Sequence, residues 1–234
     1  MRTIVKTMIW LTLFSIAMGY LETSVVIYLR KLYYPDGFRF PLVPVTREIA
    51  TVEFWREAAT IIMLLGIGIL AGKNPAQRFV FFLYSFAIWD LFYYVFLKVA
   101  LDWPESLLTW DILFLIPIPW VGPVITPCIV CVSMILFTGM VICQQEKGRH
   151  VHLAFIDWML FITGSLITIL SFCWDYIIYV STHPAQLSWT LGSRQALFEE
   201  VREYVPQEFN WWLFAAGQFI VWIAIISVYK RIRK

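Results

Sequence analysis

Residues 79–101 read FVFFLYSFAIWDLFYYVFLKVAL, an apolar run that Asp90 interrupts near its middle. A helix needs about 20 apolar residues to cross the hydrocarbon core of a bilayer. Because five further runs meet this length, the sequence predicts an all-α, polytopic helical membrane protein with six transmembrane helices. The predicted spans cover residues 4–29, 51–71, 79–101, 121–143, 153–180 and 209–229.

The composition agrees with a membrane protein. Of the 234 residues, 60% are hydrophobic and 15% are charged, whereas soluble domains are about half apolar and a quarter charged. The net charge of +2 is too small to indicate a nucleic-acid partner. We therefore predict a single integral membrane domain, residues 1–234, surrounded by the lipid bilayer. Its other partners would be membrane proteins or further copies of the same chain.

The segment before the fourth span is broken by proline and glycine. Residues 106–116 are largely apolar, but Pro117, Pro119 and Pro123 follow closely. Joined to residues 121–143, the segment would form a helix of about 38 residues, or about 57 Å, which is too long for one crossing. We expect a half-helix over residues 106–116, a turn at the prolines, and then the fourth span. The alternative is one kinked, strongly tilted helix.

Basic residues set the orientation. Lysine and arginine gather in the loop near residue 75, in the loop near residue 148 and at both ends of the chain. With six spans, these four regions lie on one side, which the positive-inside rule makes cytoplasmic. We predict a bacterial cytoplasmic (inner) membrane protein with both termini inside.

Two external loops are longer than a helix hairpin requires. They cover residues 30–50 and 181–208, and the second contains a predicted short helix over residues 194–204. Loops of this size often cap a site. The alternative is that both are ordinary connections.

Acidic residues fall inside the spans, mostly in the external half. A carboxylate in hydrocarbon costs a few kcal/mol, so it usually faces a protein-lined interior. At about 1.5 Å per residue, the acids of the first three spans come to a similar depth. The candidate ligand or ion pocket is formed by Glu22, Glu53, Arg56, Glu57, Asp90, Tyr94 and Asp111.

Three interpretations of these acids compete. In the first, they pair with nearby basic residues and have a structural role; the candidate partners are Arg30, Arg47, Arg56 and Lys98. In the second, they line an outward-facing pocket that binds or moves a cation, a proton or a small coupled solute. In the third, they hold a hard metal cation or act as acid and base on a lipid-soluble substrate. The metal ligands would then be Glu22, Glu57, Asp90 and Asp111.

No motif assigns an activity. The sequence has no Walker motif, Rossmann glycine pattern or nucleophile elbow. We therefore predict no resident cofactor, with a hard metal cation as the alternative, and we assign no catalytic residue. The leading hypothesis is the cation- or proton-binding pocket. The alternatives are a non-catalytic subunit of a larger membrane complex and a membrane enzyme.

Overall fold

The computed structural model describes residues 2–43, 46–115, 118–182 and 204–233. Within these ranges, six helices are long and apolar enough to cross a membrane. They are α1 (Arg2–Tyr33), α2 (Arg47–Ala71), α3 (Pro75–Leu101), α4 (Ile125–Glu146), α5 (Phe155–Thr182) and α7 (Trp211–Arg233). The predicted all-α membrane fold with six spans is confirmed, and most helices extend a few residues beyond their predicted ends.

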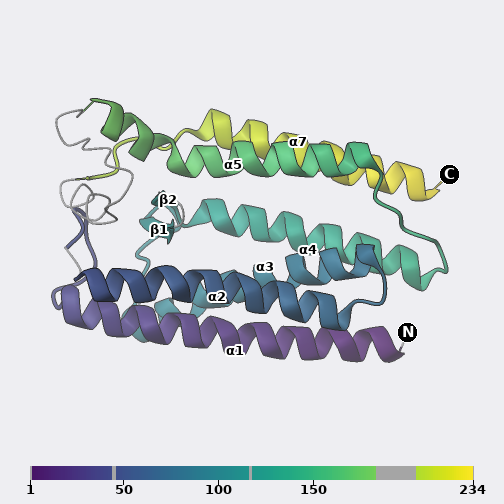
Figure 1. The fold of residues 1–234 in the computed structure, drawn as a ribbon, viewed down its shortest axis with the longest axis horizontal. Coiled ribbons are helices and arrows are strands. Elements are labelled where there is room, and N and C mark those ends of the chain that lie inside the picture. The colour runs from purple at the N-terminus through teal and green to yellow at the C-terminus, as the bar shows by residue number, and fades with distance from the viewer. Residues whose placement is uncertain (1, 44–45, 116–117, 183–203, 234) are drawn as a thin grey trace.

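The helices form two layers joined by α4. Helices α1 and α2 pack on α3, whereas α5 packs along α7. Figure 1 shows α4 between these layers and both termini at one end of the bundle. We call the end of the bundle that carries both termini the terminal end, and the opposite end of the bundle the distal end. The predicted placement of both termini on one side agrees with this arrangement.

Local sequence explains where the helices begin. The Asn74 side chain accepts a hydrogen bond of 3.0 Å from the backbone N–H of Gln77, and Pro75 follows this cap at the first helical position of α3. Thr46 caps α2 in the same way, through the N–H of Ile49. In the terminal half, α1, α3, α4, α5 and α7 share an apolar core. Its buried members are Leu11, Val80, Phe81, Phe137, Val141, Leu153, Phe161, Ala224, Ile225 and Val228.

The predicted half-helix over residues 106–116 is wrong, and so is the alternative of one kinked helix. The chain instead forms an antiparallel hairpin of β1 (Trp110–Phe114) and β2 (Trp120–Pro123), and α4 begins at Ile125 rather than near residue 121. An isolated helix of about eleven residues is marginal. In the hairpin, β2 supplies the hydrogen-bonding partners that a half-helix would have found within itself.

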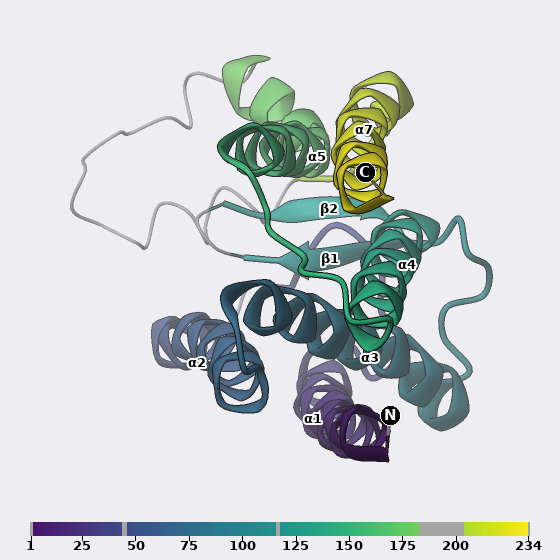
Figure 2. The same cartoon turned by 90° about the vertical axis from the view of Figure 1, so that its right-hand side faces the viewer.

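The hairpin reaches deep into the bundle. The rings of Phe114 and Trp89 lie 6.3 Å apart, centroid to centroid. Because Trp89 precedes the distal end of α3 by about 18 Å at 1.5 Å per residue, the inner end of β1 at Phe114 lies near the middle of the bundle. Figure 2 shows the two strands between the α5–α7 layer and α3, and β2 contacts α5. A Cβ at Gly122 would lie 3.2 Å from the Phe209 ring and 3.3 Å from that of Phe172, so α5 and the segment before α7 pack tightly on this strand.

The two long distal connections are only partly described. The first is shorter than the predicted 30–50, because α1 continues to Tyr33 and α2 starts at Arg47. Most of the second, including nearly all of the predicted helix over residues 194–204, lies outside the described residues. Where the description resumes, Tyr204 is buried, and its ring lies 5.2 Å from those of Tyr176 and Tyr179 on α5.

Close packing of α5 on α7 gives a stability prediction. A Cβ at Gly164 would lie 2.8 Å from a methyl group of Val221 and 2.9 Å from the carbonyl oxygen of Gly217, whereas a Cβ at Gly139 on α4 would meet nothing within 4 Å. We expect Gly164→Ala to lower the free energy of unfolding by about 1–3 kcal/mol through overpacking. The matched Gly139→Ala should leave it unchanged or raise it slightly. Thermal unfolding in detergent measures both, and equal effects would contradict the α5–α7 contact.

Candidate functional site

One group of the predicted site residues is centred on Arg56 of α2. The Arg56 guanidinium pairs with the Glu22 carboxylate of α1 and lies 2.7 Å from the Glu53 carboxylate, one helical turn earlier. The Thr60 hydroxyl lies 3.5 Å from the second oxygen of Glu22. Arg56 therefore links α1 to α2 while it faces two acids.

A second group joins the hairpin to α1 and α3. Asp111 of β1 is buried, with one oxygen 3.4 Å from the Arg30 guanidinium and the other accepting a hydrogen bond of 3.2 Å from the Tyr94 hydroxyl. Arg30 is itself only 7% exposed, and its guanidinium carbon lies 3.7 Å from the centroid of the Trp103 ring and 4.5 Å from that of Phe38. A cation–π contact of this kind helps to hold a charge that has left water.

Glu57 binds the backbone of the hairpin. Both of its carboxylate oxygens lie within hydrogen-bond distance of the N–H of Leu115, at 3.0 and 3.2 Å. Leu115 is the residue after β1, where the ladder with β2 ends. The Glu57 carboxylate therefore accepts a hydrogen bond from a main-chain N–H group that lies beyond the end of the β1–β2 ladder.

Asp90 differs from the other acids because a thiol is its neighbour. Its carboxylate accepts a hydrogen bond of 3.2 Å from Cys131 of α4. Within the described ranges, Asp90 forms no salt bridge. The stretch of α3 that carries Asp90 and Tyr94 packs on the stretch of α1 that carries Glu22. The Thr23 hydroxyl donates to the Tyr93 carbonyl oxygen over 3.2 Å, and a Cβ at Gly19 would lie 2.9 Å from the carbonyl oxygen of Trp89. The groups described above therefore lie in one region of the bundle, which we call the carboxyl cluster.

The structure thus brings together all seven sequence-predicted site residues, on α1, α2, α3 and β1. Two of the four basic partners proposed for a structural role, Arg30 and Arg56, do pair with acids of the cluster. Lys98 does not: it lies 2.7 Å from Asp102 at the exposed end of α3, and this contact lowers the pKa of the Asp102 carboxyl. Nothing is described of the Arg47 side chain. That the cluster acts as a functional pocket stays a prediction.

Sequence reasoning missed Cys131 as a member of this cluster. Cys131 is buried and unoxidised, and it is not one of the seven predicted site residues. Its contact with Asp90 depends on how α3 packs against α4, which the sequence alone does not reveal. Within the described part of the chain, the indole N–H groups of Trp89 and Trp120 are also buried without a hydrogen-bond partner, and both rings lie next to that of Phe114.

Two other buried or half-buried acids belong to structural contacts. Asp157 at the start of α5 pairs with Arg231 of α7 and accepts a hydrogen bond from the Ser227 hydroxyl. Asp175 near the distal end of α5 accepts hydrogen bonds from the Tyr204 hydroxyl and from the backbone N–H groups of Gln207 and Glu208. Burial raises the pKa of Tyr204, so its phenol keeps the proton that it donates.

The cluster offers carboxyl groups but no preformed metal centre. Across residues 2–43, 46–115, 118–182 and 204–233, no three side chains of histidine, cysteine, aspartate or glutamate are placed to hold one metal ion. In the conformation described, the Glu22, Glu57, Asp90 and Asp111 carboxylates are each occupied by a separate partner.

Comparisons with protein-family models, curated proteins and solved structures found no match for this chain. The class of protein therefore follows from the fold alone. The chain is a polytopic helical membrane protein, with a β-hairpin held inside its distal half by a carboxyl cluster.

The Arg30–Asp111 contact gives a second prediction. Arg30→Gln leaves a buried carboxylate without its cation, so we expect the free energy of unfolding to fall by about 3 kcal/mol. Adding Asp111→Asn should restore at least half of this loss, because the uncompensated charge is then removed. Thermal unfolding of the purified variants measures the difference. A double variant no more stable than Arg30→Gln would show that the pair does not act as a unit.

Proposed function

We propose that this membrane protein binds and moves protons or small cations through the carboxyl cluster of its distal half. One observation carries the proposal. Among the described residues, the cluster contains five carboxyl groups, those of Glu22, Glu53, Glu57, Asp90 and Asp111, but only two guanidinium groups, those of Arg30 and Arg56.

Charge balance supports a bound cation or proton. With every acid ionised, the two guanidinium groups would leave three negative charges uncompensated in a region that the helices and the hairpin shield from water. Uncompensated charge in such surroundings costs several kcal/mol, so carboxylates there are paired, take up protons or bind cations. Protons or small cations therefore complete the cluster, and they can leave again because each carboxyl group has an alternative hydrogen-bonding partner.

Asp90 is the best candidate for the exchanging group. It lies eleven residues before the distal end of α3 at Leu101, or about 17 Å at 1.5 Å per residue. Its hydrogen-bonding partner is the neutral Cys131 thiol, whereas the partners of Glu22 and Asp111 are guanidinium groups. Glu57 is the second candidate, because its partner is a backbone N–H rather than a cation.

The direction of access follows from the basic residues of the terminal end. By the positive-inside rule, both termini are cytoplasmic, and the distal half that contains the cluster faces the outside. A bacterial inner membrane would then supply an electrochemical gradient for the cation or proton. This orientation is part of the proposal.

Flux in proteoliposomes tests the function. With a potassium diffusion potential imposed, we expect wild-type vesicles to acidify or alkalinise internally faster than empty ones, as a pH-sensitive dye reports. Asp90→Asn keeps the hydrogen-bonding shape but loses the exchangeable proton, so the flux should fall about tenfold or more. The matched Asp102→Asn, at the exposed C-cap of the same helix, should retain the flux.

Two results would contradict the proposal. Wild-type vesicles that behave like empty ones for protons, sodium and potassium would exclude movement of these ions. An Asp90→Asn variant that folds and transports like the wild type would exclude the assigned residue. Loss of all signal together with a co-purifying membrane protein would favour the alternative of a non-catalytic subunit.

A further inference from the structure

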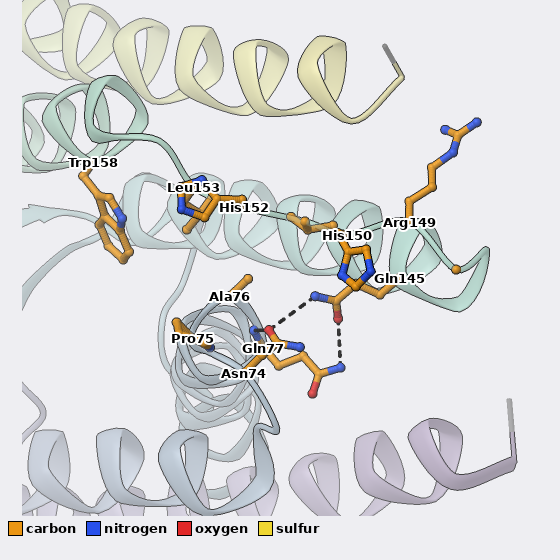
Figure 3. A pocket seen from close by; sticks show the side chains of 12 residues that line it. Asn74, Pro75, Ala76, Gln77, Gln145, Arg149, His150, His152, Leu153 and Trp158 are labelled. Atoms are coloured by element: carbon orange, nitrogen blue, oxygen red, sulfur yellow. Dashed lines mark hydrogen bonds between the residues drawn. The ribbon is translucent and has the colours of Figure 1, made fainter.

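A separate cavity lies at the terminal end, far along the bundle from the carboxyl cluster. Its volume is about 530 Å³, and it is bounded by the start of α3, the end of α4 and the segment that leads into α5 (Figure 3). Pockets for small molecules and cofactors typically measure about 300–1,000 Å³. The lining residues are Asn74, Pro75, Ala76, Gln77, Gln145, Gly148, Arg149, His150, Val151, His152, Leu153 and Trp158.

The lining is suited to an anion. It contains three side-chain amides, one arginine and two histidines, and none of its twelve residues is acidic. In the two segments that supply most of the lining, residues 72–79 and 143–153, Lys73, Arg78 and Lys147 add positive charge, and Glu146 is the one acid. The cavity therefore has the opposite electrostatic character to the distal cluster.

Hydrogen bonds between the amides hold the cavity walls together. Gln77 on α3 donates to the side-chain oxygen of Gln145 on α4 over 2.8 Å, and Gln145 donates to the Asn74 oxygen over 3.5 Å (Figure 3). Gln77 also accepts from the backbone N–H of Lys73 over 3.0 Å. The same wall carries the start of α3, a helix of 27 residues whose positive dipole end favours a nearby negative group.

Several donors at the cavity remain available for a ligand. Within the part of the chain that the structure describes, His150 and His152 form no hydrogen bond. Arg149 is exposed, and its Nη1 donates to the Gln144 side chain over 2.9 Å. Figure 3 shows this side chain at the rim of the cavity, extending away from the amides. Imidazole and guanidinium donors of this kind form charge-assisted hydrogen bonds with phosphate oxygens.

The level of the cavity along the bundle matches that of lipid headgroups. It lies where α3 begins, α4 ends and α5 begins, so the ends of three apolar spans surround it. Trp158 lines it and packs on Phe79, with ring centroids 4.6 Å apart, and tryptophan is enriched at membrane interfaces. Basic pockets between helix ends bind anionic headgroups.

We infer that this cavity binds a phosphate-bearing anion, with the His150 and His152 imidazoles as donors, the Asn74–Gln77–Gln145 amides as its fixed wall and Arg149 as a positive charge at its rim. The anion is either the headgroup of an anionic lipid or a soluble phosphate compound, because both present the same oxygens. This inference does not depend on the proposed ion movement.

Binding to the purified full chain in detergent tests the inference. Two probes are used: phosphatidylglycerol, followed by native mass spectrometry, and inorganic pyrophosphate, followed by titration calorimetry. We expect at least one probe to bind the wild type, and Arg149→Gln/His150→Asn/His152→Asn to weaken it about tenfold or more, as the loss of charge-assisted hydrogen bonds predicts. The single Arg149→Gln variant should give a smaller loss. The control Lys6→Gln/Lys230→Gln removes two cations from the same end without touching the lining.

Each outcome is decisive. Lipid binding alone that depends on the three residues identifies a headgroup site, and pyrophosphate binding alone identifies a soluble ligand. Binding of neither probe to the wild type overturns the inference. An equal loss of binding in the control variant also overturns the inference, because the effect would then come from the overall positive charge of this end and not from the cavity. Thermal unfolding confirms that the variants, which change exposed side chains, remain folded.

Discussion

The structure depends on one constraint, which is that the backbone of the re-entrant segment must find hydrogen-bonding partners inside the bundle. Main-chain polar groups at membrane depth cannot be left unpaired. The strands satisfy one another, and the N–H groups of Val124 and Ile125 continue the pairing to the carbonyl groups of Thr109 and Leu107 at 3.0 and 2.8 Å. At the inner end of β1, the Glu57 carboxylate accepts a hydrogen bond from the N–H of Leu115. The acid at this depth therefore helps the hairpin to lie deep between the layers.

This constraint accounts for part of the carboxyl cluster but not for all of it. Glu57 holds the hairpin backbone, and the Asp111–Arg30 pair ties β1 to α1, so these groups have structural roles whatever else they do. Among the residues that the structure describes, no backbone N–H donates to Asp90 and no cation pairs with it. An apolar residue could fill the same position without the cost of a buried carboxyl group. The residue that the fold needs least is therefore the one to which we assign the exchange of protons or cations.

The sequence predicted the elements that depend on composition and missed those that depend on pairing. Apolar runs of sufficient length were enough to predict all six helices. The hairpin was missed because an apolar stretch of eleven residues with prolines behind it is compatible with a short helix, and the decisive factor is whether a partner strand is available. The alternation of Trp110, Ile112 and Phe114 is the one local signal for a strand. Counting residues along the spans brought Glu22, Glu57 and Asp90 to a common depth, but the Cys131 contact required the packing of α4.

The central claim is that the cluster holds more carboxyl groups than its guanidinium groups can compensate, and that protons or cations make up the difference. The most direct measurement is infrared spectroscopy of the reconstituted protein at neutral pH in sodium- and potassium-free buffer, in H₂O and in D₂O. The claim predicts the C=O stretching band of a protonated carboxyl group, shifted by deuterium and reduced in Asp90→Asn. A spectrum with carboxylate bands alone, unchanged by this substitution, would contradict it.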